Sequence, residues 1–392
     1  FKNLCRVLNI LFQYEKIIKK YKEKRVMAKY YNKKILIMAN NDDGLYRFRG
    51  MLIKNLVDQG NEVIVSLPKG KNIPKLIELG CQIIETPIDR RGINPKTDFK
   101  LFFNYCNILK KIKPDMVIAY TIKPNIYGGL ACRLRKVSYA LNITGLGTAF
   151  QKKGVLKSLI VFLYRLAAKK SKVIFFENFE NMKTFQTLQI AKQSKYKLLN
   201  GAGVDVEHFS YLEYPKDEQV HFLFIGRIMK EKGVDELFEA MKNLYSEEKN
   251  CVLDVLGYFE EDYGIKIEKY EKEGWLKYHG YQSDIRPFVE RAHCFVLPSW
   301  HEGMANTNLE SAASGRPIIT SDIPGCKEAV IESKSGYLCE RKNSCSLYNS
   351  MNKFLKLSYE QRINMGKMGR NYMIKKFNKK KVVDETIKSL FS

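Results

Sequence analysis

His221-Phe222-Leu223-Phe224-Ile225-Gly226-Arg227-Ile228-Met229-Lys230-Glu231-Lys232-Gly233 is the stretch that indicates the fold of this chain. Its apolar first part predicts a short buried strand, and a helix is expected to follow near 233–245. An apolar run that leads through a glycine-containing turn into a helix is typical of a parallel sheet, because such strands are buried on both faces.

The same strand–turn–helix unit recurs along the chain. In the first part, a helix is expected near 48–59, and apolar runs predict strands at 34–39, 63–65, 82–84, 116–119 and 173–176. In the second part, further strands are predicted at 252–257, 294–297 and 317–320. The pattern therefore predicts an α/β protein with two doubly wound domains and a cleft between them.

Composition limits the class of protein. Of 392 residues, 45% are hydrophobic and 28% are charged, which is typical of globular domains. No apolar run reaches the ~18 residues that a membrane span needs, which argues against an integral membrane protein. None of the nine cysteines forms a C-x-x-C pair or clusters with histidine, which argues against zinc and against a disulfide framework and favours the cytoplasm.

Positive charge is concentrated in the first half. Residues 1–200 contain 39 Lys+Arg and 13 Asp+Glu, a net charge of +26, whereas residues 201–392 contain 28 and 29, a net charge of −1. We therefore expect the two halves to face different partners. Nucleic acid is one candidate partner for the basic half, but no recognition motif accompanies the charge, so we expect no nucleic-acid binding.

Breaks in the pattern predict the domain limits. Gly201–Asp205 ends the first series of strands and Tyr214–Asp217 is a polar linker. We expect a basic extension over 1–32, one domain over 33–205, a second over 206–375 and a last helix over 376–392. The chain begins with Phe1, and two interpretations of the extension stay open: a start at Met27 with upstream sequence before it, or a basic helix on a membrane.

Two segments of the second half contain residues suited to phosphate chemistry. In Pro298–Glu310, small residues lead from a strand into a helix near 305–307, and helix N-termini bind phosphates through their amides. Glu302 and Glu310 flank this point, although two solvent-facing glutamates would show the same spacing. Arg227 and Lys232, on the turn after the strand at 221–226, are placed to neutralise a diphosphate.

These segments, followed by His279–Asp284, Gly315–Ile319 and Pro324–Glu328, resemble the retaining glycosyltransferases of family 4, also called group 1 glycosyltransferases. The resemblance implies a GT-B fold of two Rossmann-like domains, an acceptor-side domain and a domain that binds the nucleotide sugar, with the last helix packed back on the first domain. It also implies a reaction without a metal or other cofactor.

The resemblance assigns roles to matching residues. Arg227 and Lys232 would hold the donor diphosphate and Glu302 the donor sugar, and these three are the expected catalytic residues. Glu310 would bind the ribose, and Tyr281 would lie by the base with the loop after Leu256. The expected remaining donor-binding residues are on the two turns: Gly226, Gly303, Met304, Ala305, Asn306 and Thr307.

Motifs of the first half resemble bacterial polysaccharide enzymes of this family. They are Tyr46–Arg49, Thr121–Gly128 and Asn142–Gly147. The resemblance implies a lipid-linked glycan acceptor on a polyprenyl diphosphate, with Arg49, Lys123 and Asn125 on the acceptor side; a solvated loop and a plain turn are the alternatives. The donor would be a UDP-hexose or UDP-N-acetylhexosamine.

A membrane surface is a further expected partner. Each Lys or Arg close to an anionic membrane contributes ~1 kcal/mol of attraction. The segment 155–170 is apolar with basic flanks, so it could lie in the membrane interface or form a core helix of the first domain. The two interpretations are compatible if one stripe of the helix faces lipid. We therefore expect a cytoplasmic enzyme, peripheral on the membrane. A nucleotide-sugar 2-epimerase of the same architecture is the alternative function.

Overall fold

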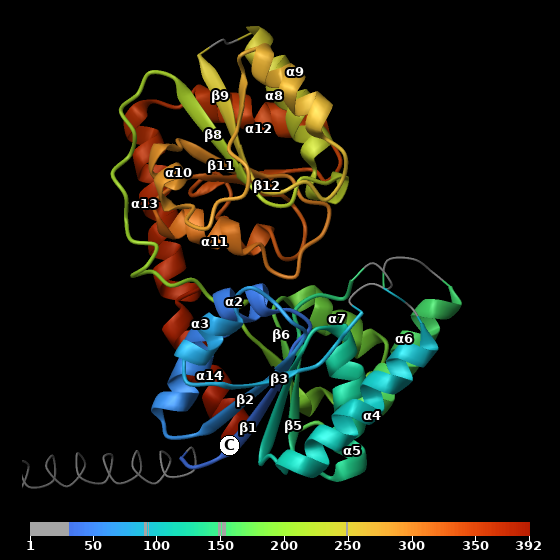
Figure 1. Cartoon of the computed structure of the whole chain (residues 1–392). Helices are drawn as coiled ribbons and strands as arrows, with labels where there is room; N and C mark the ends of the chain where they lie inside the picture. Colours follow the sequence, from blue (N-terminus) through green and yellow to red (C-terminus); the bar gives the residue numbers. More distant parts are fainter. Residues whose placement is uncertain (1–30, 90–91, 93, 148–149, 151–153, 248–249) are drawn as a thin grey trace, which may run out of the picture. The chain divides into compact units, whose positions relative to one another are not determined.

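The computed structural model describes residues 31–89, 92, 94–147, 150, 154–247 and 250–392. Residues 1–26 and the start proposed at Met27 lie outside the described residues. Two parallel sheets organise the described part (Figure 1), which confirms the prediction of doubly wound α/β architecture.

The first sheet has seven strands in the order β3-β2-β1-β4-β5-β6-β7. The strands are β1 (Lys34–Met38), β2 (Glu62–Leu67), β3 (Gln82–Glu85), β4 (Met116–Tyr120), β5 (Tyr139–Ile143), β6 (Val173–Phe176) and β7 (Tyr196–Leu198). β1 pairs in parallel with β2 on one side and with β4 on the other, so the order reverses between β1 and β4. This reversal is the topological switch point at which doubly wound sheets bind ligands.

The helices that accompany this sheet are α2 (Asp42–Asp58), α3 (Ile73–Glu78), α4 (Pro95–Ile112), the π-helical turn η1 (Pro124–Gly128), α5 (Gly129–Arg135), α6 (Val155–Ala168) and α7 (Phe179–Thr187). α2 begins earlier than the helix predicted near 48–59. The reason is a cap: the side chain of Asn41 accepts a hydrogen bond of 2.8 Å from the amide of Gly44, and Asp42 and Asp43 occupy the first turn, where the helix dipole favours acidic residues.

The second sheet has six strands in the order β10-β9-β8-β11-β12-β13. They are β8 (Val220–Ile225), β9 (Cys251–Leu256), β10 (Leu276–Tyr278), β11 (Cys294–Leu297), β12 (Ile318–Ser321) and β13 (Gly336–Cys339). All five pairings are parallel, and the order reverses between β8 and β11. This is the strand order of a Rossmann-type sheet, with its switch point beside β8.

Helices cover both faces of the second sheet (Figure 1), with α8 packed against α12 and α11 against α13. The helices are α8 (Val234–Glu247), α9 (Gly264–Lys272), α10 (Arg286–Arg291), α11 (Asn306–Ala313), α12 (Ser344–Leu355) and α13 (Tyr359–Lys376). A further helix, α14 (Lys379–Phe391), follows α13, and its residues from Glu385 onward belong to the compact unit of the first sheet. Among the described helices, none is both long enough and apolar enough to cross a membrane.

The chain divides into two compact units. The first unit holds the residues up to Asn142, with Ser158–Ile174 and Glu385–Ser392. The second unit holds Ile143–Lys157 and Phe175–Asp384. The domain limits inferred from the sequence, at 205 and 375, stay a prediction.

A buried arginine ties the segment before β8 to the rest of the second unit. Arg316 has an exposed fraction of 0% and donates to the carbonyl oxygens of Leu212 (3.1 Å) and Glu213 (2.7 Å). It also donates to those of Val289 (2.8 Å) and Glu290 (3.1 Å), which end α10. Burial lowers the pKa of Arg316 to about 10, so the guanidinium stays charged at neutral pH and holds these loops together.

Candidate active site

The switch point of the second sheet places two loops side by side. The loop after β8 contains Gly226–Gly233 and the loop after β11 contains Pro298–Ala305. β8 connects outward to β9 and β11 connects outward to β12, and in doubly wound sheets this switch point at the carboxyl ends of the strands is where ligands bind. Both segments singled out in the sequence therefore meet at the place where such a sheet binds ligands.

Lys232 and Glu302 are brought together where these two loops meet. The Lys232 ammonium donates to the carboxylate of Glu302, and the two side chains keep only 18% and 13% of their exposure. Gly233 makes this approach possible: its φ is +73°, and a Cβ there would clash with the carbonyl oxygen of Pro298. The pair is thus two opposite charges held close to the ends of β8 and β11, largely out of solvent.

Arg227 lies on the same loop but has a different partner. Its guanidinium is 3.6 Å from a carboxylate oxygen of Glu260, and its side chain keeps 38% of its exposure. The amide of Gly226 donates to the carbonyl of Leu256 at 3.0 Å and so joins the ends of β8 and β9. A half-exposed cation at this position can reorient toward an anionic ligand.

The start of α11 lacks a side-chain cap, as do the starts of α3, α5, α9 and α10, whereas α7, α12 and α13 have one. Asn178, Asn343 and Ser358 each accept a hydrogen bond from the first turn of α7, α12 and α13. The N-cap of α11 is Ala305, which has no side-chain acceptor. Such an end leaves backbone donors and a partial positive charge for an anion.

The amides at this end are not equivalent. The amide of Ala305 donates to the carbonyl of Gly325 at 2.7 Å. Among the described residues, no acceptor faces the amides of Asn306 and Thr307. Phosphate binding at α11 would therefore use the amides of Asn306 and Thr307, whereas the amide of Ala305 is already engaged.

Close packing explains the small residues before α11. A Cβ on Gly303 would clash with the carbonyl oxygen of Thr144, and the Gly303 carbonyl accepts a 2.6 Å hydrogen bond from the Asn178 side chain. Met304 is buried, and its side chain lies where a Cβ on Gly201 would be. Met304 is thus a packing residue whose side chain is directed into the protein.

The residues expected around the nucleoside lie on two loops and on helix α11. Tyr281 follows β10, is 55% exposed, and has its ring centroid 6.4 Å from that of Tyr258, which follows β9. Tyr281 and the loop after Leu256 are therefore neighbours in the structure. Glu310 lies in the second turn of α11 and is half-buried. Their contacts with a nucleoside stay predictions.

The acceptor-side residues of the first unit have internal partners. The Arg49 guanidinium is buried and lies 5.0 Å above the ring centre of Tyr120. Lys123 donates to Asp98 at 2.7 Å, and each of these two side chains keeps 14% of its exposure. These cations are thus neutralised or shielded in the structure, and an acceptor would have to compete for them.

Asn125 has a position that is built into the fold. It is 1% exposed, donates to the carbonyl of Asn142 at 2.7 Å and accepts from the amide of Asn142 at 3.2 Å. These bonds tie the start of η1 to β5. Direct contact of Asn125 with an acceptor stays a prediction.

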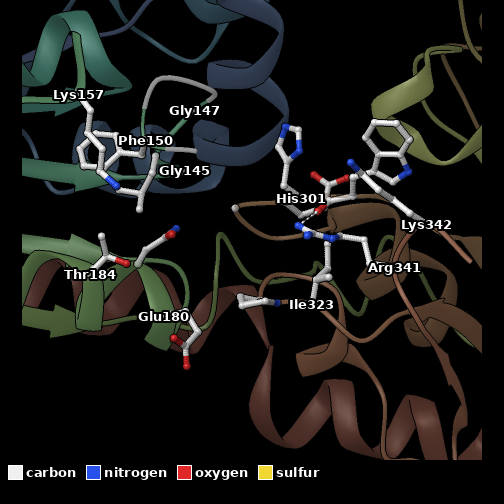
Figure 2. A pocket seen from close by; sticks show the side chains of 16 residues that line it. Gly145, Gly147, Phe150, Lys157, Glu180, Thr184, His301, Ile323, Arg341 and Lys342 are labelled. Carbon is white, nitrogen blue, oxygen red and sulfur yellow. Dashed lines mark hydrogen bonds between the residues drawn. The ribbon is translucent and has the colours of Figure 1, made fainter. Parts of the chain in front are cut away.

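A pocket of about 620 Å³ opens beside Glu302 (Figure 2), and all its lining residues belong to the second unit. Figure 2 shows His301, Arg341 and Lys342 on one side and Lys157, Phe150 and Thr184 on the other. The lining residues to which the sequence assigned no individual role are Gly145, Leu146, Gly147, Phe150, Lys157, Glu180, Asn181, Thr184, Trp300, His301, Ile323, Pro324, Arg341 and Lys342. Arg341 and Lys342 follow the end of β13 after one residue, so the rule that ligands gather at carboxyl strand ends could have found them.

No group of three or more His, Cys, Asp or Glu suited to a metal ion occurs in the described part of the chain. The polar groups of the site are instead two cations, a carboxylate and helix-end amides. Such a set can hold a diphosphate and stabilise negative charge on a departing phosphate.

Comparison with known proteins identifies the family. Residues 208–372 match the family model "Glycosyl transferases group 1", and residues 34–178 match "Glycosyl transferase 4-like". The chain is 29% identical over 351 residues to the N,N'-diacetylbacillosaminyl-diphospho-undecaprenol alpha-1,3-N-acetylgalactosaminyltransferase of Campylobacter jejuni, covering 85% of this chain and 92% of that protein. It is 29% identical over 324 residues to the UDP-Gal:alpha-D-GlcNAc-diphosphoundecaprenol alpha-1,3-galactosyltransferase of Escherichia coli, covering 77% and 81%.

A solved structure gives the same fold. The crystal structure of Anabaena HepE in complex with UDP-glucose superposes with a TM-score of 0.75 at 16% identity, covering 92% of this chain and 100% of that chain. At this identity the likeness shows the fold alone. Together with the two family models, it shows that the chain belongs to the group 1 glycosyltransferases and is a glycosyltransferase with the GT-B fold.

Proposed function

We propose that this chain transfers a sugar from a nucleoside diphosphate sugar, with retention of anomeric configuration, to a glycan acceptor on a polyprenyl diphosphate. The observation that carries the proposal is the Lys232–Glu302 pair beside the uncapped start of α11. It combines a cation for the leaving group with a carboxylate for the sugar hydroxyls.

The leaving diphosphate gains negative charge as the bond to the sugar breaks. Lys232 and the amides of Asn306 and Thr307 are fixed positive or partly positive groups, and Arg227 can turn toward the diphosphate when the donor binds. Groups that are already oriented stabilise this charge without reorganising at the moment of reaction. On donor binding, Lys232 would divide its hydrogen bonds between Glu302 and the diphosphate. A carboxylate oxygen of Glu302 would then be free to accept a hydrogen bond from a sugar hydroxyl. We propose that these groups serve without a metal ion.

The acceptor class follows from the relatives. The names of the C. jejuni and E. coli relatives both specify glycans on undecaprenol diphosphate. Coverage of both relatives is high, which supports the same acceptor class here, in capsule, O-antigen or related polysaccharide synthesis. The E. coli name specifies a UDP-sugar, which favours a UDP-hexose or UDP-N-acetylhexosamine donor.

The exposed face of α6 supports a peripheral position on a cytoplasmic membrane surface. Val155, Leu159 and Phe162 are spaced for one face and are 88%, 50% and 54% exposed. Val161 and Tyr164, on the other face, are buried. Leu159→Ser/Phe162→Ser should weaken binding to vesicles with anionic lipid by about tenfold or more, because each apolar side chain contributes ~1.5–3 kcal/mol when fully buried. Equal vesicle binding by the variant and the wild-type chain would contradict this part of the proposal.

The first test is thermal unfolding with UDP, GDP or ADP, each with and without EDTA. A ligand at ~100 times its dissociation constant stabilises the native state by ~2.7 kcal/mol. We expect one nucleotide, UDP, to raise the midpoint, and EDTA to leave the increase unchanged. No increase with any nucleotide would contradict the donor site, and an increase abolished by EDTA would contradict a metal-free reaction.

The second test is transfer from UDP-sugars to synthetic polyprenyl diphosphate-linked sugars, with the product linkage read by NMR. We expect the anomeric configuration of the donor to be kept. The relatives named above are glycosyltransferases and give the alternative of a 2-epimerase no support. Conversion of a UDP-sugar to its epimer without any acceptor would reverse that choice.

A further inference from the structure

Two neighbouring cations of the pocket have no acidic partner among the residues that the structure describes. Arg341 and Lys342 are exposed and line the pocket beside Glu302. In the described part of the chain, the polar contact of Arg341 is the carbonyl oxygen of Trp300 at 3.5 Å, and neither cation forms an ion pair. By contrast, Lys232 is paired with Glu302.

Trp300 holds both cations in place. The Lys342 ammonium lies 4.0 Å above the centre of the Trp300 ring, a short cation–π distance, and Arg341 contacts the carbonyl of the same residue. Trp300 is itself fixed, because its indole N–H donates to Glu236 at 3.1 Å and its amide donates to the Glu231 carbonyl at 2.9 Å. The two charges are therefore presented to the pocket from a rigid base.

The charge balance of the pocket favours an anion. Three cations line it: Lys157, Arg341 and Lys342. The lining carboxylates are Glu302, which already holds Lys232, and Glu180. Arg227, the cation expected at the donor diphosphate, is not among the lining residues and is paired with Glu260. Arg341 and Lys342 thus form a second group of cations, separate from Arg227 and Lys232 on the loop after β8.

We propose that Arg341 and Lys342 form a second anion site, which binds the diphosphate of the acceptor. This inference rests on the proposed function, because it names the residues that recognise its acceptor. The planar guanidinium of Arg341 can bind one phosphate through two parallel hydrogen bonds, and the compact ammonium of Lys342 adds a point charge beside it. A diphosphate of the nucleotide sugar is the other source of the same chemistry, and the experiment separates the two.

The test is isothermal titration of the chain saturated with UDP, so that the donor site is filled. The probes are inorganic diphosphate, farnesyl diphosphate and, as the uncharged control, farnesol. We expect both diphosphates to bind the UDP-loaded wild-type chain. Arg341→Ala/Lys342→Ala should weaken both by about ten- to a hundredfold, since hydrogen bonds to charged groups contribute ~1.5–3 kcal/mol. The dissociation constant of UDP should stay within twofold.

A matched variant controls for the loss of two positive charges. Lys353 and Lys356 are exposed residues of the same unit, at the end of α12 and outside the pocket lining. Lys353→Ala/Lys356→Ala should bind both diphosphates as the wild-type chain does. In transfer assays, Arg341→Ala/Lys342→Ala should raise KM for the lipid diphosphate acceptor with kcat and the donor KM unchanged.

Three outcomes would overturn the site: diphosphate that displaces UDP, equal binding by the double variant, or weaker UDP binding by the double variant. Failure of the proposed function has a different signature. A wild-type chain that uses no polyprenyl diphosphate acceptor, yet binds diphosphate through Arg341 and Lys342, would retain the anion site and contradict the acceptor class.

Discussion

The two sheets share the same central strand order, but the loops at their switch points use polar side chains differently. In the first unit, after β1 and β4, Lys123 is paired with Asp98, and Asn125 is bonded to the backbone of β5. In the second unit, after β8 and β11, Lys232 and Glu302 meet beside a pocket, and Arg341 and Lys342 face it with no acidic partner among the described residues. With the same topology, the polar side chains at the first switch point are bonded within the protein, whereas charged side chains at the second switch point face a pocket and can bind a ligand.

The largest expected effect is a loss of turnover on substitution at the second switch point. Lys232→Ala should lower kcat/KM for transfer by about 10³-fold, or about 4 kcal/mol, because removing a group that stabilises transition-state charge has costs of this order. Glu302→Gln, which keeps the shape of the side chain, should also lower turnover strongly. Steady-state kinetics measures both variants, and thermal unfolding should show that they remain folded.

The matched control is Lys123→Ala at the first switch point. Lys123 is also a lysine held by one carboxylate, so the chemical change is the same. We expect a much smaller loss of turnover than for Lys232→Ala. Equal losses at the two positions would remove the distinction between the units, and near-normal turnover in folded Lys232→Ala would contradict its catalytic assignment.

A smaller effect, on stability, separates structural from catalytic cations within the second unit. Arg316→Met would leave the carbonyls of Leu212 and Glu213 without the guanidinium donor. Unsatisfied buried groups are costly, so the free energy of unfolding should fall by about 3 kcal/mol. Chemical denaturation measures this change, and Arg316→Lys, which keeps the charge, should lose less. Unchanged stability in Arg316→Met would show that the linker is held by other contacts.

The sequence predicted the fold well because burial on both faces leaves continuous apolar runs. Lys232 and Glu302 could be found because both follow such runs within a few residues. The role of Trp300 could not, because its partners Glu236 and Lys342 lie 64 and 42 positions away in the chain, and cation–π contacts have no sequence pattern. Arg316 lies within the Gly315–Ile319 motif, but its structural role could not be predicted, because its partners are backbone carbonyls and these have no sequence pattern.

The amino end of the second sheet provides a pH-dependent contrast to the carboxyl end. His293, just before β11, is 1% exposed, and burial, with the nearby His221, lowers its pKa from 6.5 to about 4. The unfolded chain therefore binds a proton more readily than the folded chain as the pH falls through this range. The contribution of neutral His293 to the free energy of unfolding is fully present above about pH 6.5 and declines toward pH 4. The free energy of unfolding should fall by about 2 kcal/mol between pH 7.5 and pH 5.

His293→Asn should flatten this dependence, because its amide oxygen can accept from the His221 amide but does not titrate. Denaturation curves at pH 7.5, 6 and 5 measure the slope. His208→Gln is the control, since His208 is exposed and its removal should leave the slope nearly unchanged. The same slope in His293→Asn and wild type would assign the acid sensitivity to other groups.

The smallest effect decides the role of Asn125 at the first switch point. Asn125→Ala removes a donor to the Asn142 carbonyl and an acceptor for its amide in a buried site, so stability should fall by about 1–2 kcal/mol. Asn107→Ala, on the exposed face of α4, is the control and should be nearly neutral. If the side chain only ties η1 to β5, the folded variant keeps the wild-type KM for a polyprenyl diphosphate acceptor. A raised acceptor KM with unchanged stability would instead place Asn125 on the acceptor side and make the two switch points alike in facing a ligand.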